Sequence, residues 1–361
     1  MMYKFPKINF IGNKEKIAYW ISEFFPADAT IFFDAFSGGT SMSYQAKIKG
    51  LKVISNDILK INYQLSKSLI ENSHEFFDQD DVKTLFEGDP KKGFMFENYT
   101  DKYFFADECM QLDLYRENIE KLPTEYKKSI AFALLRRAMI RKMPYSRFNI
   151  QWDKVVQLRD EKYSYDKYKR KRAYHNQTFK SHFLENLDEY NRAVFDNGQQ
   201  NIALNDDIFN LLGKVEADII YLDPPYTGTM NNYFEFYGLI DEYIASEKLT
   251  PFDNNFIDKK TCGLLFDNLF ANLKTYKYWI LSYNNTSFPS KNQLVALLEQ
   301  YSDDILIIEK DHIYKITGKE KKQENKEYLF FIKNTALLKE IAQNNTNQTA
   351  KNKEDYAAAE L

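Results

Sequence analysis

One four-residue stretch, Asp223-Pro224-Pro225-Tyr226, could activate an aromatic amine. The lone pair of such a nitrogen is delocalised into its ring, so the nitrogen is a poor nucleophile until it becomes tetrahedral. The Asp223 carboxylate and the Pro224 carbonyl could accept the two amine hydrogens and favour that shape, and two prolines would hold the carbonyl in place. The ring of Tyr226 could stack on the substrate. Taken alone, the stretch could also be a tight turn after a buried strand.

A glycine-rich turn earlier in the chain could hold a ligand. The short apolar run from Ile31 to Phe36 predicts a buried strand, and Ser37-Gly38-Gly39-Thr40-Ser41 interrupts it. Glycine lacks a Cβ atom, so the backbone there can approach a ligand closely at the start of the following helix. Asp57 ends the next strand and could accept hydrogen bonds from ribose hydroxyls. Its alternative role is to cap the helix that follows.

Strands and helices alternate around both turns. Before residue 72 the pattern predicts strand, helix, strand and helix at 31–36, 42–49, 53–55 and 60–71. After residue 200 it predicts strands at 201–204, 218–222 and 278–283, and helices at 207–212, 260–274 and 290–301. Two final strand-like runs, 305–310 and 328–333, predict an antiparallel hairpin at the edge of the sheet. Such alternation is typical of an open parallel sheet with right-handed crossovers.

The alternation stops between about Ser73 and Asn197, where the pattern is mostly helical. Within it, Glu125 to Lys142 predicts one amphipathic helix. An insertion of this size is usually functional rather than a connecting loop. The C-terminal tail, from about Ile341 onward, contains too few apolar side chains to pack against the rest of the chain. We therefore predict an α/β fold with these parts: a discontinuous, Rossmann-like sheet domain at 1–75 and 196–335, an inserted domain at 76–195 and a flexible tail at 341–361.

Charge is distributed unevenly along the chain. The net charge of −3 does not by itself suit a nucleic-acid partner. From Lys127 to Arg172, however, fifteen Lys and Arg residues stand against four Asp and Glu residues, so the rest of the chain carries a net charge of −14. A basic surface displaces the counterions of a phosphate backbone. The segment thus favours a nucleic-acid partner; the alternative is a solvated helical face.

Basic and aromatic residues are interleaved in this segment. Cationic side chains track phosphates, whereas arginines and aromatic rings also hold bases. The candidate nucleic-acid-binding residues are Arg141, Lys142, Arg147, Lys169, Arg170 and Arg172. We expect the affinity for nucleic acid to fall steeply with added salt, and neutralisation of Lys169, Arg170 and Arg172 to flatten that dependence.

Other kinds of site find little support in the sequence. Cys109 and Cys262 lie far apart and the four histidines are scattered, so neither a zinc site nor a disulfide framework is expected. No run of eighteen apolar residues predicts a membrane span, and the first ten residues do not form a secretion signal. We expect an intracellular protein of bacterial type.

The motifs, in this order, resemble those of the alpha class of adenine-specific DNA methyltransferases, the Dam-like enzymes that are common in restriction–modification systems. Besides the Asp223–Tyr226 turn, the resemblance rests on five segments. They are Phe10-Ile11-Gly12-Asn13-Lys14, Asp34-Ala35-Phe36-Ser37-Gly38-Gly39, Asn56-Asp57, Asp207 and Ser282-Tyr283-Asn284. The alpha class is marked by the order of its parts: the glycine-rich loop comes first, then the insertion, and then the catalytic turn. The match covers somewhat more than half of the chain.

The resemblance implies S-adenosyl-L-methionine as the cofactor, methyl transfer to the exocyclic amine of adenine, and no metal ion. The implied catalytic residues are Asp223, Pro224, Pro225 and Tyr226. The implied cofactor-binding residues are Phe10, Gly12, Lys14, Asp34, Phe36, Ser37, Gly38, Gly39, Thr40, Asp57 and Asp207, with Asp206 as a competitor for the role of Asp207. Tyr226, Ser282 and Tyr283 would line the target-base pocket. In one departure, Thr40 stands where the family often has a further glycine.

The resemblance also implies double-stranded DNA as the substrate, with the basic insertion as a target-recognition domain. The target base must then leave the duplex to reach the catalytic turn. A separately encoded restriction endonuclease is an implied partner, and the bacterial cytoplasm the implied location. Asp at the first catalytic position favours adenine over cytosine, since serine is commoner there in the cytosine enzymes. Two alternatives stay open: methylation of an RNA amine or a protein glutamine, and a non-catalytic DNA-recognition subunit.

Overall fold

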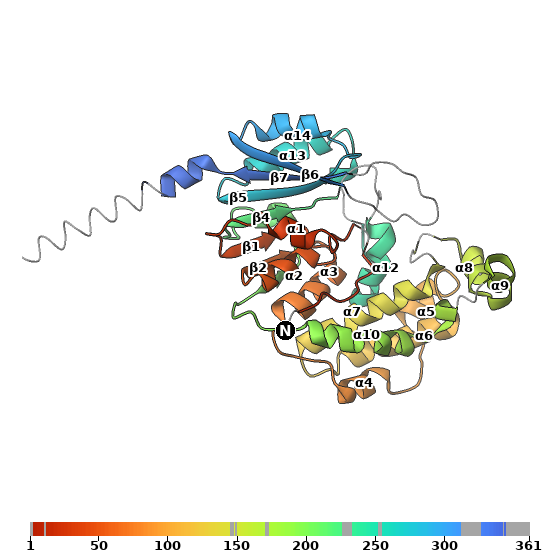
Figure 1. The fold of residues 1–361 in the computed structure, drawn as a ribbon. Coiled ribbons are helices and arrows are strands. Elements are labelled where there is room, and N and C mark those ends of the chain that lie inside the picture. Colours follow the sequence, from red (N-terminus) through yellow and green to blue (C-terminus); the bar gives the residue numbers. More distant parts are fainter. Residues whose placement is uncertain are drawn as a thin grey trace, which may run out of the picture. The chain divides into compact units, whose positions relative to one another are not determined.

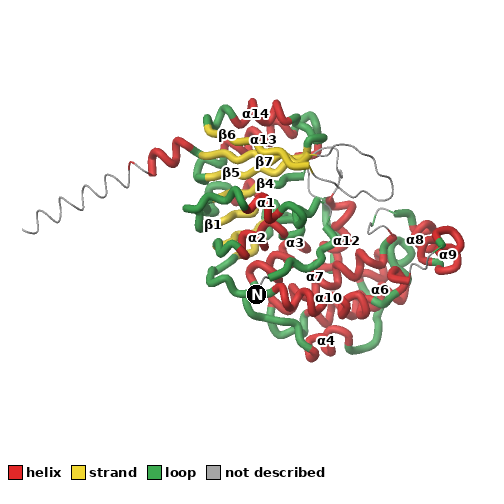
Figure 2. The backbone as a smooth tube through the Cα atoms, viewed as in Figure 1, coloured by secondary structure: helices red, strands yellow, loops and turns green. Residues whose placement is uncertain are grey.

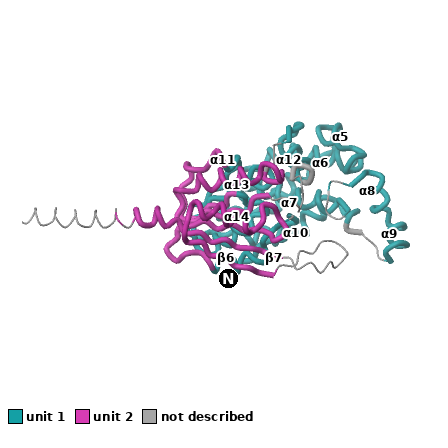
Figure 3. The backbone as a smooth tube through the Cα atoms, turned by 90° about the horizontal axis from the view of Figure 1, so that it is seen from above, with its two compact units in different colours: residues 1–23, 36–208, 230–253 teal, residues 24–35, 209–229, 254–361 magenta. Residues whose placement is uncertain are grey.

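The structure (Figure 1), a computed structural model, describes residues 3–10, 12–144, 148, 150–169, 173–225, 233–251, 255–311, 326–341 and 343. Helices and strands are distinguished in Figure 2. The chain packs into two compact units, coloured separately in Figure 3. Unit 1 comprises residues 1–23, 36–208 and 230–253, and unit 2 comprises residues 24–35, 209–229 and 254–361. Each unit therefore combines segments that are far apart in the sequence.

Unit 2 contains five of the seven strands of the sheet. In spatial order they are β1 (Ile31–Asp34), β4 (Ile219–Leu222), β5 (Tyr278–Asn284), β7 (Lys326–Lys333) and β6 (Asp304–Asp311). β1, β4 and β5 run parallel, whereas β7 runs antiparallel to β5 and β6 antiparallel to β7. The predicted hairpin is thus confirmed. β4 and β5 are buried along their whole length, as expected for apolar strands that are covered on both faces.

Three helices accompany these strands, and each was predicted with somewhat wider bounds. They are α11 (Ile208–Leu211), α13 (Cys262–Ala271) and α14 (Lys291–Leu298). Ser290 begins α14 with a capping box, in which its hydroxyl accepts from the Gln293 N–H and the Gln293 side chain accepts from the Ser290 N–H. The bounds differ mainly because helix ends fray and close with turns.

Unit 1 contains the other two strands and the helices next to them. β2 (Lys52–Asn56) and β3 (Ile202–Leu204) run parallel. The helices are α1 (Ala18–Ser22), α2 (Ser41–Ile48), α3 (Lys60–Ser66) and α12 (Tyr233–Ala245), and a π-helical turn (Lys67–Glu71) continues α3. The predicted helix at 60–71 is therefore confirmed as α3 with its continuation. The sequence analysis does not predict α1 or α12.

The long stretch between β2 and β3 is mostly helical, as predicted (Figures 1 and 2). After the π-helical turn its helices are α4 (Gln79–Phe86), α5 (Phe94–Tyr99), α6 (Ala106–Ile119), α7 (Glu125–Lys142), α8 (Trp152–Arg159), α9 (Glu161–Tyr168) and α10 (Phe179–Ala193). The functional division predicted at 75/76 and 195/196 stays a prediction. The predicted tail lies outside the described residues, apart from residues 341 and 343.

α7 has the predicted bounds but not the predicted character. Its side chains are buried almost continuously from Ser129 to Ile140, including Arg136 and Arg137. α7 packs against α3, α10 and the π-helical turn, so neighbours cover it on more than one face. The expectation of an amphipathic helix is therefore corrected: this is a central helix whose two arginines lie inside the protein.

The architecture confirms the predicted fold class, a mixed α/β protein with a largely parallel sheet and an antiparallel strand pair at one edge. Both cysteines, Cys109 and Cys262, are buried free thiols. Among the described helices, none is both long enough and apolar enough to cross a membrane.

Candidate active site

The glycine-rich turn connects β1 to α2. Gly38 has a φ of +49°, a left-handed conformation that glycine adopts without strain. A Cβ atom at Gly38 would lie 2.8 Å from Cε1 of Phe10, and one at Gly39 would lie 3.1 Å from Cβ of Phe10. The turn thus packs so closely against Phe10 that a larger residue at either glycine would require Phe10 to shift. Phe10 and the two glycines, predicted from separate motifs, are neighbours in the structure.

Asp57 closes this turn from the end of β2. Its Oδ2 accepts a hydrogen bond from the Gly38 N–H at 2.8 Å, and its Oδ1 accepts one from the Leu59 N–H at 2.9 Å. Burial raises the pKa of Asp57, and these N–H donors oppose the rise. Asp57 therefore supports the chain just before α3 and lies beside the glycine turn, whereas its contact with ribose hydroxyls stays a prediction. A carboxylate has about four acceptor positions, so Asp57 can accept from a further donor.

Asp206 and Asp207 follow β3, which pairs with β2 so that Leu204 lies opposite Asn56. The Asn56 amide donates to the Asp206 carbonyl at 3.0 Å and accepts from the Asp206 N–H at 3.1 Å. The Oδ1 atom of Asp206 accepts from the Asp207 N–H at 2.8 Å, whereas Asp207 is exposed. Both acids are therefore held next to the residue that precedes Asp57, and Asp207 has the more accessible carboxylate.

Thr40 occupies the position where the family often has a further glycine. Its φ of 63° is left-handed, which is uncommon for residues other than glycine. Thr40 is fully buried, and its Oγ1 has no hydrogen-bond partner among the described residues. Its carbonyl accepts the Tyr44 N–H at 2.9 Å and so begins α2. A strained backbone and an unsatisfied hydroxyl at one position fit a turn that is shaped for a ligand rather than for stability.

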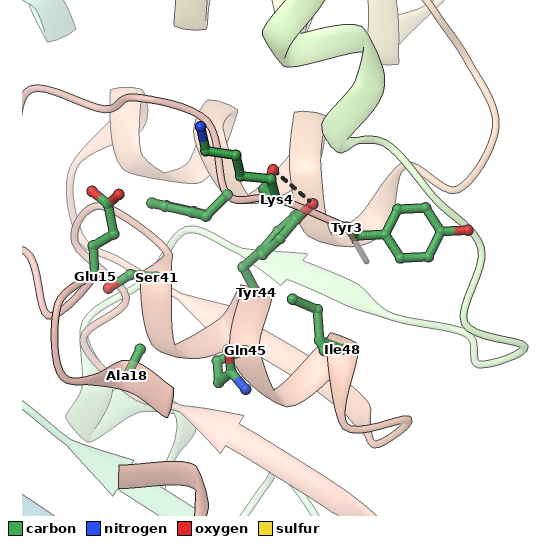
Figure 4. A pocket seen from close by; sticks show the side chains of 9 residues that line it. Tyr3, Lys4, Glu15, Ala18, Ser41, Tyr44, Gln45 and Ile48 are labelled. Carbon is green, nitrogen blue, oxygen red and sulfur yellow. Dashed lines mark hydrogen bonds between the residues drawn. The ribbon is translucent and has the colours of Figure 1, made fainter. Parts of the chain in front are cut away.

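Gly12 and Lys14 lie in the loop that leads from Phe10 to α1. Gly12 has a φ of +83°, and Lys14 is buried. Closer to the N-terminus, the Lys4 carbonyl accepts a hydrogen bond from the Tyr44 hydroxyl of α2 at 3.4 Å (Figure 4). A hollow of about 410 Å³ lies here, and its lining includes Lys4, Glu15, Ser41, Tyr44, Gln45 and Ile48. None of the residues predicted to bind a cofactor lines this hollow, so it is not part of the candidate cofactor site.

In unit 2 the predicted catalytic turn follows β4 directly. Asp34, the last residue of β1, lies opposite Tyr221 in the β1–β4 register. Because the carboxyl ends of parallel strands meet at one edge of a sheet, Asp34 and Asp223 lie at the same edge. Asp223 and Pro225 are half-buried and Pro224 is buried. A rigid, buried strand thus presents the carboxylate of Asp223 at the edge where α/β proteins bind their ligands.

Of the three residues predicted to line a target-base pocket, Tyr226 lies outside the described residues. Ser282 and Tyr283 lie on β5 and are fully buried. The Ser282 hydroxyl donates to Oε1 of Glu327 at 2.5 Å, and the Tyr283 hydroxyl donates to the Pro289 carbonyl at 2.9 Å. Burial also raises the pKa of Tyr283. The prediction is corrected for Ser282 and Tyr283, because both side chains stabilise the fold and present no surface to a base.

Lys142 belongs to a buried ionic network centred on Glu108. Its Nζ lies 2.6 Å from Oε1 of Glu108, and Arg159 binds the two carboxylate oxygens at 2.6 and 2.8 Å. Burial opposes the charge of Glu108, but Arg159 and Lys142 outweigh it and lower the pKa of the carboxyl. The prediction that Lys142 binds phosphate is therefore corrected: its charge is neutralised inside the protein, where the network joins α6, α7 and α8.

The other predicted nucleic-acid contacts fall into two groups. Arg147, Arg170 and Arg172 lie outside the described residues. Arg141 is half-buried and pairs with Glu185 at 3.3 Å, whereas Lys169 is exposed directly after α9.

The exposed cations of this segment gather on α9. Lys162, Lys167 and Lys169 are exposed, and so is Tyr165, at 59%. Several basic residues of α7 instead serve the fold: Arg136 and Arg137 are buried, and Lys127 pairs with Asp78 and Asp81. Much of the local charge excess is therefore structural, and α9 is the described part of it that faces solvent.

Asp241, on α12, is a residue that the sequence analysis missed. Its Oδ2 accepts from the Lys60 N–H at 2.8 Å and its Oδ1 from the Ile61 N–H at 2.9 Å. Asp241 therefore caps the first two N–H groups of α3, which follow the N-cap residue Leu59. Burial raises the pKa of Asp241 to about 7, and the nearby charge of Asp57 adds to that rise. One signal pointed to such a residue: Leu59 stands at the N-cap of α3, where a polar side chain is usual.

Comparison with known proteins adds a family to this geometry. A family model described as D12 class N6 adenine-specific DNA methyltransferase matches residues 10–297. The chain is 56% identical over 331 residues to the type II methyltransferase M2.HphI of Haemophilus parahaemolyticus, with 92% of this chain and 98% of that relative covered. It is 26% identical to M.CviAII of Paramecium bursaria Chlorella virus 1, with 90% and 98% covered. It is 24% identical to M.FokI of Planomicrobium okeanokoites, with 96% of this chain but 55% of that relative covered.

Proposed function

The chain belongs to the D12 class of N6 adenine-specific DNA methyltransferases, and we propose that it transfers a methyl group from S-adenosylmethionine to adenine at a specific site in duplex DNA. One observation carries the use of this cofactor: Phe10, Gly38 and Asp57, from three separate motifs, lie side by side. Family membership also favours DNA over the RNA and protein substrates that the sequence left open.

The residues of unit 1 suit the parts of this cofactor. Gly38 and Gly39 allow a close backbone approach, Asp57 can accept from ribose hydroxyls, and the exposed carboxylate of Asp207 can accept from an adenine amino group. The bound cofactor would supply an electrophilic methyl group. We assign it the further contacts Phe10, Gly12, Lys14, Phe36, Ser37 and Thr40, and Asp34 in unit 2 stays a contact that the family resemblance alone implies. No metal ion is part of the proposal.

We assign catalysis to the turn after β4. The Asp223 carboxylate and the Pro224 carbonyl accept the hydrogens of the target amine and favour its tetrahedral form. The buried strand before them and the two prolines restrict the backbone, so both acceptors are in place before the substrate arrives. Tyr226 stacks on the base, which leaves the duplex to enter the site.

The type II names of the relatives support a role in restriction–modification. We propose in addition a separately encoded endonuclease as partner and the bacterial cytoplasm as location. The test is to sequence DNA from cells that express the chain by a method that detects N6-methyladenine. We expect modified adenines at one recurrent sequence, and none in cells that express Asp223→Ala. Unmodified DNA, or methylated cytosine, contradicts the proposal.

Replacing Gly38 with alanine is expected to weaken S-adenosylmethionine binding about tenfold or more. The added Cβ would press on the Phe10 ring at 2.8 Å and impose left-handed strain. Calorimetric titration measures the effect. Gly50→Ala is the matched control, since Gly50 has a φ of +83° but nothing within 4 Å of its would-be Cβ atom. Equal cofactor affinity in the two variants would show that the Gly38 turn does not bind the cofactor.

The affinity for duplex DNA is expected to fall steeply with salt, and neutralising α9 should flatten this dependence. Changing Lys162, Lys167 and Lys169 to glutamine should reduce the slope of log K against log salt by about two to three, if each contacts one phosphate. Anisotropy titrations at several salt concentrations give the slope. The same triple change at the exposed residues Lys214, Lys259 and Lys260 is the charge-matched control. Equal slopes in the two variants would show that α9 does not bind the phosphates.

A further inference from the structure

Arg136 of α7 is a buried cation that the proposed reaction does not use. Its side chain is 0% exposed. Its Nη2 donates to the carbonyl oxygen of Asn9 at 2.9 Å, directly before Phe10. Its Nε and Nη1 have no hydrogen-bond partner among the described residues. Burying a charge is unfavourable unless neighbouring groups stabilise it. The groups that surround the guanidinium of Arg136 must therefore offset the cost of burying it.

Two aromatic rings contribute to that stabilisation. The guanidinium carbon of Arg136 lies 5.8 Å from the ring centroid of Phe10 and 5.3 Å from that of Tyr237 on α12. The two rings stack on each other, with centroids 5.0 Å apart and planes at 11°. Cations within about 6 Å of a ring centroid are attracted to the ring. Arg136 thus holds Phe10 in two ways, through the preceding carbonyl and through the ring itself.

The position of Phe10 matters because the glycine-rich turn packs against it. A Cβ atom added at Gly38 would lie 2.8 Å from Cε1 of Phe10. The atom nearest to a Cβ added at Gly39 is the Cβ of Phe10. A Phe10 ring that could rotate freely would have to be ordered when a ligand binds, and that ordering opposes binding. A ring that is already held avoids this loss.

We propose that Arg136 is a positioning residue for the cofactor, which orders Phe10 against the glycine turn before S-adenosylmethionine binds. This inference rests on the proposed use of that cofactor. It also means that α7, which lies in the segment predicted to recognise DNA, contributes to the cofactor site.

The next residue, Arg137, is a matched control. It is also buried, and it binds the same N-terminal segment by donating to the Lys7 carbonyl at 2.7 Å and to Oδ1 of Asn9 at 2.5 Å. It holds this segment through residues 7 and 9 rather than through the ring of Phe10. Loss of either arginine should lower the melting temperature, but only loss of Arg136 should act selectively on the cofactor.

The experiment compares Arg136→Met, Arg136→Lys and Arg137→Met in the full-length protein. Arg136→Met should raise both the KM and the calorimetric Kd for S-adenosylmethionine about tenfold, with kcat within about twofold of wild type. Arg137→Met should change the KM less than about threefold. Lysine keeps a charged donor for the Asn9 carbonyl but lacks the planar face. Arg136→Lys should therefore recover most of the melting temperature while the KM stays raised by about threefold.

Equal KM values in Arg136→Met and Arg137→Met would overturn the inference, and so would a fall in kcat at unchanged KM. If Arg136→Met does not fold, the KM of Arg136→Lys tests the inference instead. A KM equal to that of wild type would then overturn the role of Arg136. Failure of the wild-type protein to bind S-adenosylmethionine would instead contradict the proposed function. Wild-type binding together with unaltered binding by the Arg136 variants would contradict the role of Arg136 alone.

Discussion

Replacing Asp223 with alanine is expected to slow methyl transfer by at least about a hundredfold while S-adenosylmethionine binds within about threefold of wild type. The carboxylate is one of two groups proposed to accept the amine hydrogens. It directly follows β4, a fully buried strand that parallel strands flank on both sides. The substitution does not alter Phe10, Gly38 or Asp57, the residues proposed to contact the cofactor. Single-turnover methylation of a duplex and calorimetric titration of the cofactor measure the two effects separately.

Asp218, at the opposite end of β4, is the matched control. Its carboxylate accepts from the Thr30 N–H at 2.8 Å and the Ile31 N–H at 3.0 Å, and it pairs with Lys277 at 2.7 Å. Asp218→Ala should therefore destabilise the same strand but leave the rate of the folded protein close to wild type. If Asp223→Ala loses cofactor binding as completely as it loses activity, the catalytic assignment of Asp223 is wrong.

Replacing Glu108 with alanine is expected to lower the free energy of unfolding by about 3–5 kcal/mol. The substitution would leave Lys142 and Arg159 buried without the carboxylate that neutralises them. Arg159 is the last residue of α8, so its loss of partner should also loosen the connection to α9. Urea unfolding followed by circular dichroism measures the change. Glu120→Ala, which removes a half-exposed partner of Arg116 and Lys128, should change the same quantity by less than about 1 kcal/mol.

The same network predicts a pH dependence. Burial alone would raise the pKa of Glu108, but Arg159 and Lys142 hold it below its ordinary value of 4.5. A carboxyl whose pKa is lower in the folded protein stabilises the fold above its unfolded pKa and loses that contribution as the pH falls. The stability difference between wild type and Glu108→Ala should therefore narrow below about pH 4.5. A difference that stays constant down to the acid transition would show that the charge of Glu108 does not stabilise the fold.

The sequence predicted best what short-range chemistry determines. Gly38 permits a left-handed backbone and the two prolines after Asp223 restrict theirs, so the turns they make are recognisable without a structure. The apolar runs before these turns predicted β1 and β4 to within two residues. The sequence placed Asp57 at the end of the strand after the glycine turn, and the structure shows it bonded to the Gly38 N–H.

Long-range partners of polar side chains could not be predicted in this way. No spacing rule connects Glu108 with Arg159, or Asp241 with the start of α3. Lys142 was interpreted as a nucleic-acid contact because it stands in a basic segment, and only the packing around α7 reveals that it is buried. Ser282 and Tyr283 match a family motif in residue type, yet their hydroxyls are engaged by Glu327 and Pro289. A motif names residue types, but burial depends on which elements cover them.

The burial of α7 has a consequence for how this protein can acquire a new recognition sequence. Arg136 and Arg137 bond to residues 7 and 9, so recombination that exchanged residues 76–195 between relatives would import a helix whose arginines must match another protein's N-terminal segment. Residues 76–195 therefore cannot be exchanged without affecting the contacts between α7 and the N-terminal segment. A chimaera whose crossover points lie on either side of α8 and α9 would leave α7 with its own N-terminus. The incoming α8 would still have to supply an arginine at position 159, because Arg159 binds the buried carboxylate of Glu108 on α6.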